Sequence, residues 1–129
     1  MIIGLGTDIV SLERIAKLLD KSGATFIEKI CSSQEKKYLQ SCADITAKLA
    51  KLWAVKEAAV KALGTGFIEG ISFKDIELRH NDLGRPEIEF KNAALKRLQL
   101  LSDYKTTNIL VSLSDDKPWA QAVVIIEKI

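Results

Sequence analysis

The sequence predicts an α+β protein in which an antiparallel sheet packs around one long central helix. Three observations point to this class. Residues 45–64 are rich in Ala, Leu and Lys, the composition of a long helix. Residues 108–114 and 119–126 alternate apolar with polar side chains around a short turn, which is typical of an antiparallel hairpin. Helical and strand segments follow one another without the regular alternation that a parallel sheet requires.

The chain starts with a predicted strand and helix. Apolar residues surround Gly4 and Gly6, which indicates a short buried strand that ends near Asp8. Ser11 is suited to cap a helix, because apolar residues then recur at the helical period. Gly23 stands where the C-cap of that helix is expected.

Capping signals predict the next two helices. Ser32 and Glu35 have the spacing of a capping box, which indicates a short helix that continues through Leu39. Asp44 is suited to cap the long helix. We expect that helix to stop at Gly64, in the left-handed C-cap conformation.

The remaining segments predict strands and one more helix. Residues 71–78 alternate with a one-step phase shift, which indicates a strand with a bulge. Residues 80–86 have turn composition, and 87–90 form the second strand of this pair. Asn92 is suited to cap a helix over 93–101, which precedes the hairpin.

Composition limits the organisation and the partners. The length of 129 residues predicts one domain over 1–129, and 47% hydrophobic residues supply a core. A net charge of +2 is too small to favour nucleic acid or a membrane surface through bulk charge. No apolar run approaches the roughly 18 residues of a membrane span, and the start has no basic segment of a secretory signal. We therefore expect a cytoplasmic protein with neither nucleic acid nor membrane as a partner.

Metal sites built on sulfur and imidazole are not expected. Cys31 and Cys42 do not form a C-x-x-C pair, and His80 is the sole histidine. We interpret both thiols as reduced packing residues.

The long helix carries the residues that best suit chemistry. At 100° per residue its apolar side chains form one broad stripe with Lys56 in the middle. A lysine there must reach solvent, lose its charge or meet an anion, because an unpaired buried ammonium costs several kcal/mol. Glu57 lies at the edge of the stripe, one turn before Lys61. This spacing fits either a weak surface ion pair or a carboxylate and cations at the rim of a cleft.

Asp8 supplies a second carboxylate from a strand end. Alone it is equally compatible with a turn or cap, but magnesium takes only one or two protein carboxylates beside water and phosphate oxygens. Asp8, Glu57, Lys56 and Lys61 together suit a metal and pyrophosphate site. A dinucleotide fingerprint is excluded, because its third glycine would fall at Ile9.

Four segments resemble the bacterial holo-acyl-carrier-protein synthases of the 4′-phosphopantetheinyl transferase superfamily. They are GLGTDIVSLERI, WAVKEAAVKALGTGF, NDLGRP and VSLSDDKPWAQAVVIIE, and the likeness covers nearly the whole chain. The superfamily pattern W-x-x-K-E-x-x-x-K is met at Trp53, Lys56, Glu57 and Lys61. This pattern is specific in combination with the early G-x-D.

The resemblance implies an activity and a set of roles. Asp8 and Glu57 would hold Mg²⁺ at the pyrophosphate of coenzyme A, and Lys56 and Lys61 would face phosphates. A serine of apo acyl carrier protein would accept 4′-phosphopantetheine, with release of 3′,5′-ADP, in support of fatty acid biosynthesis. Asp8, Glu57 and Lys61 are thus the candidate catalytic residues. Either Glu57 or a metal-activated water would take the serine proton, and the sequence does not choose between them.

The resemblance also implies the surroundings of this site. The nucleotide end of the coenzyme A site would include Gly64 and Thr65 in the GTG turn, and Arg85 with Pro86. Small enzymes of the family are homotrimers with sites between subunits, so we expect a homotrimer.

The carrier is expected on the first helix. The resemblance assigns Arg14 to it, and Lys17 and Lys21 share that helix face at i+3 and i+7. A non-catalytic module that docks an acidic partner helix through these three cations remains the alternative. Simple docking has no reason to require the set of Asp8, Glu57 and Lys61.

Two positions depart from the family. Many members have arginine where this chain has Leu52, and many have histidine where it has Asp115. We expect the first change to remove a phosphate contact that Lys51 could replace.

Overall fold

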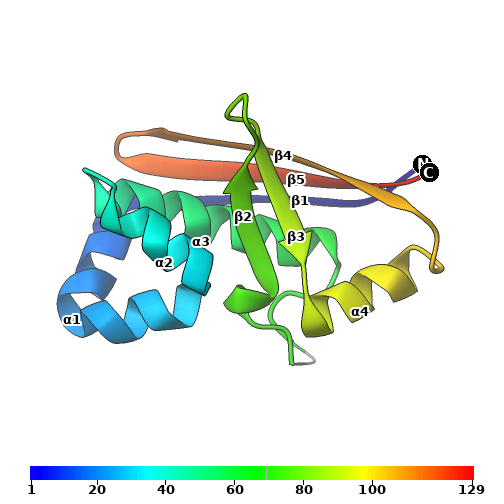
Figure 1. Cartoon of the computed structure of the whole chain (residues 1–129), viewed down its shortest axis with the longest axis horizontal. Coiled ribbons are helices and arrows are strands. Elements are labelled where there is room, and N and C mark those ends of the chain that lie inside the picture. The colour runs from blue at the N-terminus through cyan, green and yellow to red at the C-terminus, as the bar shows by residue number, and fades with distance from the viewer. Residues whose placement is uncertain (69) are drawn as a thin grey trace.

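The computed structural model describes residues 1–68 and 70–129, and it has the α+β architecture that the sequence predicts (Figure 1). The elements follow in the order β1 (Ile2–Ser11), α1 (Leu12–Ile30), α2 (Ser33–Gln40), α3 (Ile45–Ala62), the 3₁₀ turn η1 (Phe73–Asp75), β2 (Ile76–His80), β3 (Pro86–Phe90), α4 (Asn92–Leu101), β4 (Thr107–Asp116) and β5 (Trp119–Lys128). Within the part of the chain described, no helix is both long and apolar enough to cross a membrane.

The strands form two antiparallel sheets. The larger has the order β1-β5-β4, so the predicted C-terminal hairpin supplies two of its strands. The smaller is the β2–β3 hairpin, which crosses the larger sheet in Figure 1. The helix α3 lies along the larger sheet, with α1 and α2 near its N-terminal half. The two chain ends meet, because the Met1 amino group donates to the Lys128 carbonyl at 2.9 Å.

Helix α3 is buried on almost all sides rather than along one stripe. Its buried residues are Ala47, Leu49, Ala50, Leu52, Ala54, Val55, Lys56, Ala58, Ala59, Val60 and Ala62. The expectation of a single apolar stripe was therefore too narrow, because α3 packs against β1 and β5 on one side and α1 and β2 on others. Small alanine side chains permit this close packing.

Two glycines allow β1 to approach α3 closely. A methyl group at Gly4 would lie 2.2 Å from the Ala62 carbonyl oxygen, and one at Gly6 would lie 1.8 Å from the Ala58 carbonyl oxygen. Both distances are far below contact, so only glycine fits. Side chains two residues apart share a face of a strand, so Asp8 also faces α3.

Three local expectations were wrong. Helix α1 is kinked at Ser22 and Gly23 but resumes and continues to Ile30. The expected bulge in residues 71–78 is the 3₁₀ turn η1, after which β2 begins. The side chain of Asn92 caps no helix and instead donates to Asp75 at 3.3 Å, so the N-cap of α4 is the preceding residue.

The face of the larger sheet opposite α3 exposes apolar side chains. Leu5 is 61% exposed and Ile9 is 60% exposed, both on β1. Leu5 pairs across the sheet with Ile125, which pairs in turn with Leu110. These residues, Leu5, Ile9, Leu110 and Ile125, are called the apolar sheet face below.

Candidate active site

The carboxylate of Asp8 is held against α3 by Lys61. The Asp8 side chain is 14% exposed, and its Oδ1 accepts a hydrogen bond from Lys61 Nζ at 3.1 Å. Lys61 Nζ also donates to the Thr7 carbonyl at 2.9 Å, which fastens the lysine to β1. Asp8 Oδ2 is buried and has no hydrogen-bond partner among the described residues. A buried carboxylate oxygen without a partner costs free energy, so a donor or a cation bound at this atom would be stabilising.

Glu57 completes a pair of carboxylates. It is half-buried on α3, one turn before Lys61. Burial raises the pKa of Glu57 above its usual value, and the nearby charge of Asp8 raises this pKa further, while Lys61 and Arg14 oppose the shift. The two carboxylates therefore repel each other, and a cation between them would relieve the repulsion.

The pair fits Mg²⁺ better than a metal that needs nitrogen or sulfur. Both donors are carboxylates, and Mg²⁺ is bound by one or two of them beside other oxygen ligands. The described residues contain no cluster of three or more His, Cys, Asp or Glu that could hold a metal. The orphaned Asp8 oxygen and the raised Glu57 pKa are thus the observations that favour a metal here.

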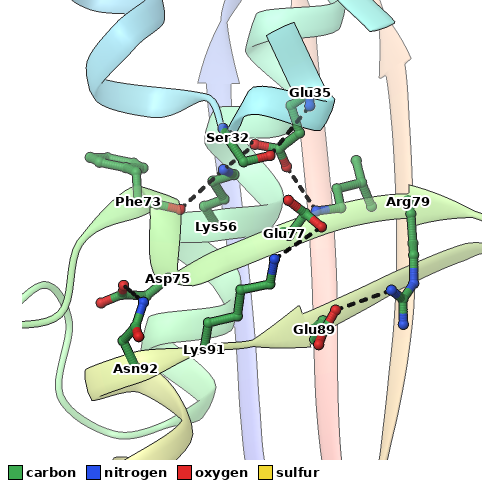
Figure 2. A network of polar contacts seen from close by, with 11 residues as sticks. Ser32, Glu35, Lys56, Phe73, Asp75, Glu77, Arg79, Glu89, Lys91 and Asn92 are labelled. Atoms are coloured by element: carbon green, nitrogen blue, oxygen red, sulfur yellow. Dashed lines mark hydrogen bonds and ion pairs between the residues drawn. The ribbon is translucent and has the colours of Figure 1, made fainter. Parts of the chain in front are cut away.

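Lys56 is not placed to face phosphates, which corrects the prediction. Its side chain is fully buried, and its Nζ donates to the Ile30 carbonyl at 2.7 Å, the Phe73 carbonyl at 3.0 Å and Glu35 Oε1 at 2.6 Å (Figure 2). A lysine ammonium has three donors, so none remains for a phosphate. Burial lowers the pKa of Lys56, and the charge of Glu35 opposes this.

Glu35 is the anion that sequence reasoning missed. Glu35 forms the predicted capping box with Ser32, and this role was a sufficient reason for a glutamate at that position. Its carboxylate is 3% exposed and bonds Lys56 from a position 21 residues earlier in the chain. A buried lysine in an apolar helix was the only signal that such a partner existed.

The turn after α3 is a helix C-cap. Gly64 has φ +80°, the left-handed conformation that glycine adopts at this position. The backbone N–H groups of Gly64 and Thr65 donate to the carbonyls of Lys61 and Val60. These N–H groups already have acceptors within the turn, so they are not available to a nucleotide. A contact of Gly64 and Thr65 with a nucleotide through their other atoms stays a prediction.

Arg85 and Pro86 lie on another element. Arg85 is exposed at the turn between β2 and β3, and its backbone N–H donates to Asn81 Oδ1 at 3.0 Å. Pro86 begins β3. No hydrogen bond or ion pair within the described ranges joins either residue to Asp8 or Glu57, so the structure does not bring the predicted nucleotide contacts at Arg85 and Pro86 together with these two carboxylates.

The three cations of α1 line one groove. Arg14, Lys17 and Lys21 line a cavity of about 740 Å³ together with the apolar side chains Leu18, Phe26 and Trp53. The Arg14 guanidinium lies over the Trp53 ring, 5.2 Å from its centre. Trp53 lies one turn before Glu57 on α3, so this groove adjoins the carboxylate pair, and the charge of Arg14 opposes the rise in the Glu57 pKa. The sequence did not indicate Phe26 or Trp53 as walls of the groove.

The two departures from the family pattern lie near one another. Leu52 is 1% exposed and belongs to the core. The neighbouring Lys51 forms an ion pair with Asp115 at 3.3 Å. Lys51 thus has a partner on β4 and is not simply free to replace an arginine.

Comparison with known proteins places these features in context. Residues 4–123 match the model of the 4′-phosphopantetheinyl transferase superfamily. The chain is 42% identical over 130 residues to the holo-[acyl-carrier-protein] synthase of Dinoroseobacter shibae, covering 100% of this chain and 94% of that protein. The structure is similar to holo-[acyl-carrier-protein] synthase from Neisseria meningitidis, with a TM-score of 0.88, 37% identity, and coverage of 99% of this chain and 100% of that one. A holo-(acyl-carrier-protein) synthase from Bacillus anthracis, in complex with CoA (3′,5′-ADP), gives a TM-score of 0.81 at 34% identity, covering 100% and 99% of the two chains.

Proposed function

The chain belongs to the 4′-phosphopantetheinyl transferase superfamily, and we propose that it transfers 4′-phosphopantetheine from coenzyme A to a serine of apo acyl carrier protein. The other product is 3′,5′-ADP. Full-length relatives named holo-[acyl-carrier-protein] synthase support this activity, and one of them was solved in complex with CoA (3′,5′-ADP). The reaction would serve fatty acid biosynthesis in the cytoplasm, where free thiols such as Cys31 and Cys42 stay reduced.

The unpartnered oxygen of Asp8 carries the proposal. It is a buried acceptor with no donor among the described residues, and Asp8 faces α3, where burial and the Asp8 charge raise the pKa of Glu57. Mg²⁺ held by Asp8 and Glu57 would neutralise the charge that develops on the pyrophosphate of coenzyme A. A docking module would have no use for this pair.

Lys61 would bind a phosphate oxygen beside that pair. Its ammonium has three donors, and two of them are used by Thr7 and Asp8. The side chain is 51% exposed, so the third donor is accessible to a ligand. Lys61 would therefore hold Asp8 in place and stabilise negative charge on the transferred phosphate.

The groove on α1 would receive the carrier. Arg14, Lys17 and Lys21 supply positive charge along its wall, and Phe26 and Trp53 supply apolar contact. An acidic helix with apolar side chains on the same face would fit this combination. Because the groove adjoins Glu57, a serine on such a helix would lie near the carboxylate pair.

A homotrimer would complete the coenzyme A site. The apolar sheet face offers a surface that monomers rarely expose, since Leu5 and Ile9 are both more than half exposed. In closed cyclic symmetry this face would be buried at each interface. Asp8 and Glu57 of one subunit would then meet Arg85 and Pro86 of its neighbour.

Intact mass spectrometry tests the activity. Apo carrier incubated with the protein, coenzyme A and Mg²⁺ should gain one phosphopantetheine group, and EDTA should prevent the gain. Asp8→Ala and Glu57→Ala should each lower kcat/KM at least about 100-fold, a loss of about 2.7 kcal/mol of transition-state stabilisation. Wild-type rates in either variant would show that the carboxylate pair is not the site.

A further inference from the structure

The buried ion pair of Lys56 and Glu35 joins parts of the chain that are far apart in sequence. Lys56, in the middle of α3, donates to the carbonyls of Ile30 at the end of α1 and Phe73 in η1. Glu35, in α2, accepts the third donor of the ammonium. Each of the three N–H groups of the Lys56 ammonium therefore points to an acceptor on a different element.

The carboxylate of Glu35 adds two more fixed contacts. Its Oε1 also accepts from the Ser32 backbone N–H at 2.8 Å, and its Oε2 accepts from the Leu78 backbone N–H at 2.8 Å. Figure 2 shows the pair at the centre of this polar cluster. Through these bonds one ion pair fixes α1, α2, α3, η1 and β2 relative to each other.

Such a pair adds little stability compared with an apolar pair of the same volume. The desolvation of two buried charges offsets most of their attraction, and apolar replacements are often as stable. Apolar contacts differ from this pair because they do not depend on angle, whereas hydrogen bonds hold a side chain in one direction. Many of the buried residues of α3 are alanines, whose short side chains resist a small rotation of the helix less than three directed hydrogen bonds from Lys56 do.

We propose that the Lys56–Glu35 pair is a positioning device that sets the rotation of α3 and thereby aims Glu57 at Asp8. Glu57 directly follows Lys56, so any rotation of Lys56 moves Glu57 with it. Lys56 and Glu35 are thus positioning residues that touch no ligand. The inference rests on the proposed function, because Asp8 and Glu57 are taken as its metal pair.

A small rotation is enough to matter. Side-chain ends lie about 5 to 6 Å from a helix axis, so a rotation of about 20° displaces them by about 2 Å. A displacement of about 1 Å at reacting groups can lower a rate by about 100-fold. Because Ile30 ends α1, the same pair also anchors the part of α1 after the kink at Ser22 and Gly23, which carries the groove residue Phe26.

Glu35→Gln is the sharpest perturbation. Glu35 accepts three N–H groups with two oxygens, whereas glutamine has one oxygen. In either orientation its amide would place a donor against Leu78 N–H or against Lys56 and Ser32. Lys56→Met is a larger change, because it removes all three hydrogen bonds of the ammonium. If Lys56→Met does not fold, Glu35→Gln still tests the inference.

Glu77→Gln is the matched control. Glu77 is a buried carboxylate of the same cluster that pairs with Lys91 at 3.2 Å and accepts a hydrogen bond from the Ser32 side chain. The substitution is chemically identical, but among the described residues Glu77 shares no hydrogen bond with Lys56 or Glu35, so the contacts of the ion pair itself remain. All variants are compared at temperatures where thermal unfolding shows them fully folded.

Two readouts do not depend on turnover. The first is emission from Trp53 in a Trp119→Phe background, with neither metal nor coenzyme A present. Trp53 lies on α3, 5.1 Å from the Phe73 ring and 6.0 Å from the Phe26 ring, so rotation of α3 changes its surroundings. The second is Mn²⁺ binding in the presence of coenzyme A, followed through the EPR signal of free Mn²⁺.

Glu35→Gln should shift the Trp53 emission, weaken Mn²⁺ binding at least about tenfold and lower kcat at least about tenfold, while Glu77→Gln changes neither constant by more than about twofold. Unchanged emission, Mn²⁺ affinity and kcat in folded Glu35→Gln would overturn the inference. Equal effects in Glu77→Gln would overturn it as well. If wild type and Asp8→Ala bind Mn²⁺ equally, the proposed metal site fails, and the Trp53 emission alone then decides the positioning role.

Discussion

Replacement of Gly6 by alanine should separate β1 from α3 and displace the carboxylate of Asp8. The new methyl carbon would lie 1.8 Å from the Ala58 carbonyl oxygen and 2.7 Å from the Ala62 nitrogen. Real contacts of this kind begin near 3.0 Å, so strand and helix must part by about 1.2 Å, the difference between 3.0 and 1.8. Both clashing atoms are backbone atoms, which no change of side-chain rotamer can move away.

The expected cost is large in both stability and rate. Overpacking of a close contact costs about 1 to 3 kcal/mol, and a clash with backbone belongs at about the upper end. Asp8 is two residues beyond Gly6, and a displacement of about 1 Å at a reacting group can cost about 100-fold in rate. Urea denaturation measures the first effect, and kcat/KM of the folded protein measures the second.

Gly70→Ala is the control for this substitution. Among the described residues, a methyl group at Gly70 would meet nothing within 4 Å, and its φ of +81° adds only local strain, so the folded variant should keep its kcat/KM. A Gly6→Ala protein with the stability and the kcat/KM of wild type would show that close approach of β1 does not place Asp8.

Three further outcomes are expected. Arg14→Glu should raise the KM for the carrier much more than the KM for coenzyme A in steady-state assays, because it reverses a charge in the α1 groove. Leu5→Asp on the apolar sheet face should convert the proposed trimer to monomers in sedimentation, with loss of transfer. The hydrogen bond from Ser32, followed by that from Lys91, holds the pKa of Glu77 below its ordinary value. The carboxylate therefore stabilises the fold fully above the ordinary glutamate pKa, and this contribution is lost as the pH falls through the lower folded-state pKa. Urea denaturation from pH 7 to pH 3 should therefore show less loss of stability with acid in Glu77→Gln than in wild type.

Local signals predicted most helix starts. The side chain of Asp44 accepts from the third helical residue of α3, and Ser32 with Glu35 forms a complete capping box. These signals act within a single turn, so the sequence displays them directly. The end of α1 was not predicted, because Gly23 is a stop signal that tertiary packing overrides. Phe26 and Ile30 are buried in the core and hold the resumed helix in place.

The sequence indicated Asp8, Glu57 and Lys61 as one group through motifs, and the structure places Lys61 Nζ 3.1 Å from Asp8 Oδ1. Glu57 and Lys61 are one helical turn apart, and Asp8 belongs to the early G-x-D that the family likeness singled out. Lys56 was misassigned because its partner lies 21 residues away in sequence and 2.6 Å away in space. Spacing along one helix carries no information about such a partner. Nothing in the sequence indicated that Glu35 pairs with Lys56, because the capping box was already a sufficient reason for a glutamate at this position.

The pattern W-x-x-K-E-x-x-x-K combines two sets of residues with different tasks. Trp53, Glu57 and Lys61 recur every four residues, so at 100° per residue each is turned only 40° from the one before, and all three share one side of α3. That side is partly open, since Trp53 and Glu57 are half-buried and Lys61 is exposed. Lys56 is turned 100° from Glu57 and is fully buried. Three positions of the motif thus share the partly open side of α3, where the proposed metal and carrier sites lie, while the fourth faces the core, where our proposal gives it the task of orienting the other three.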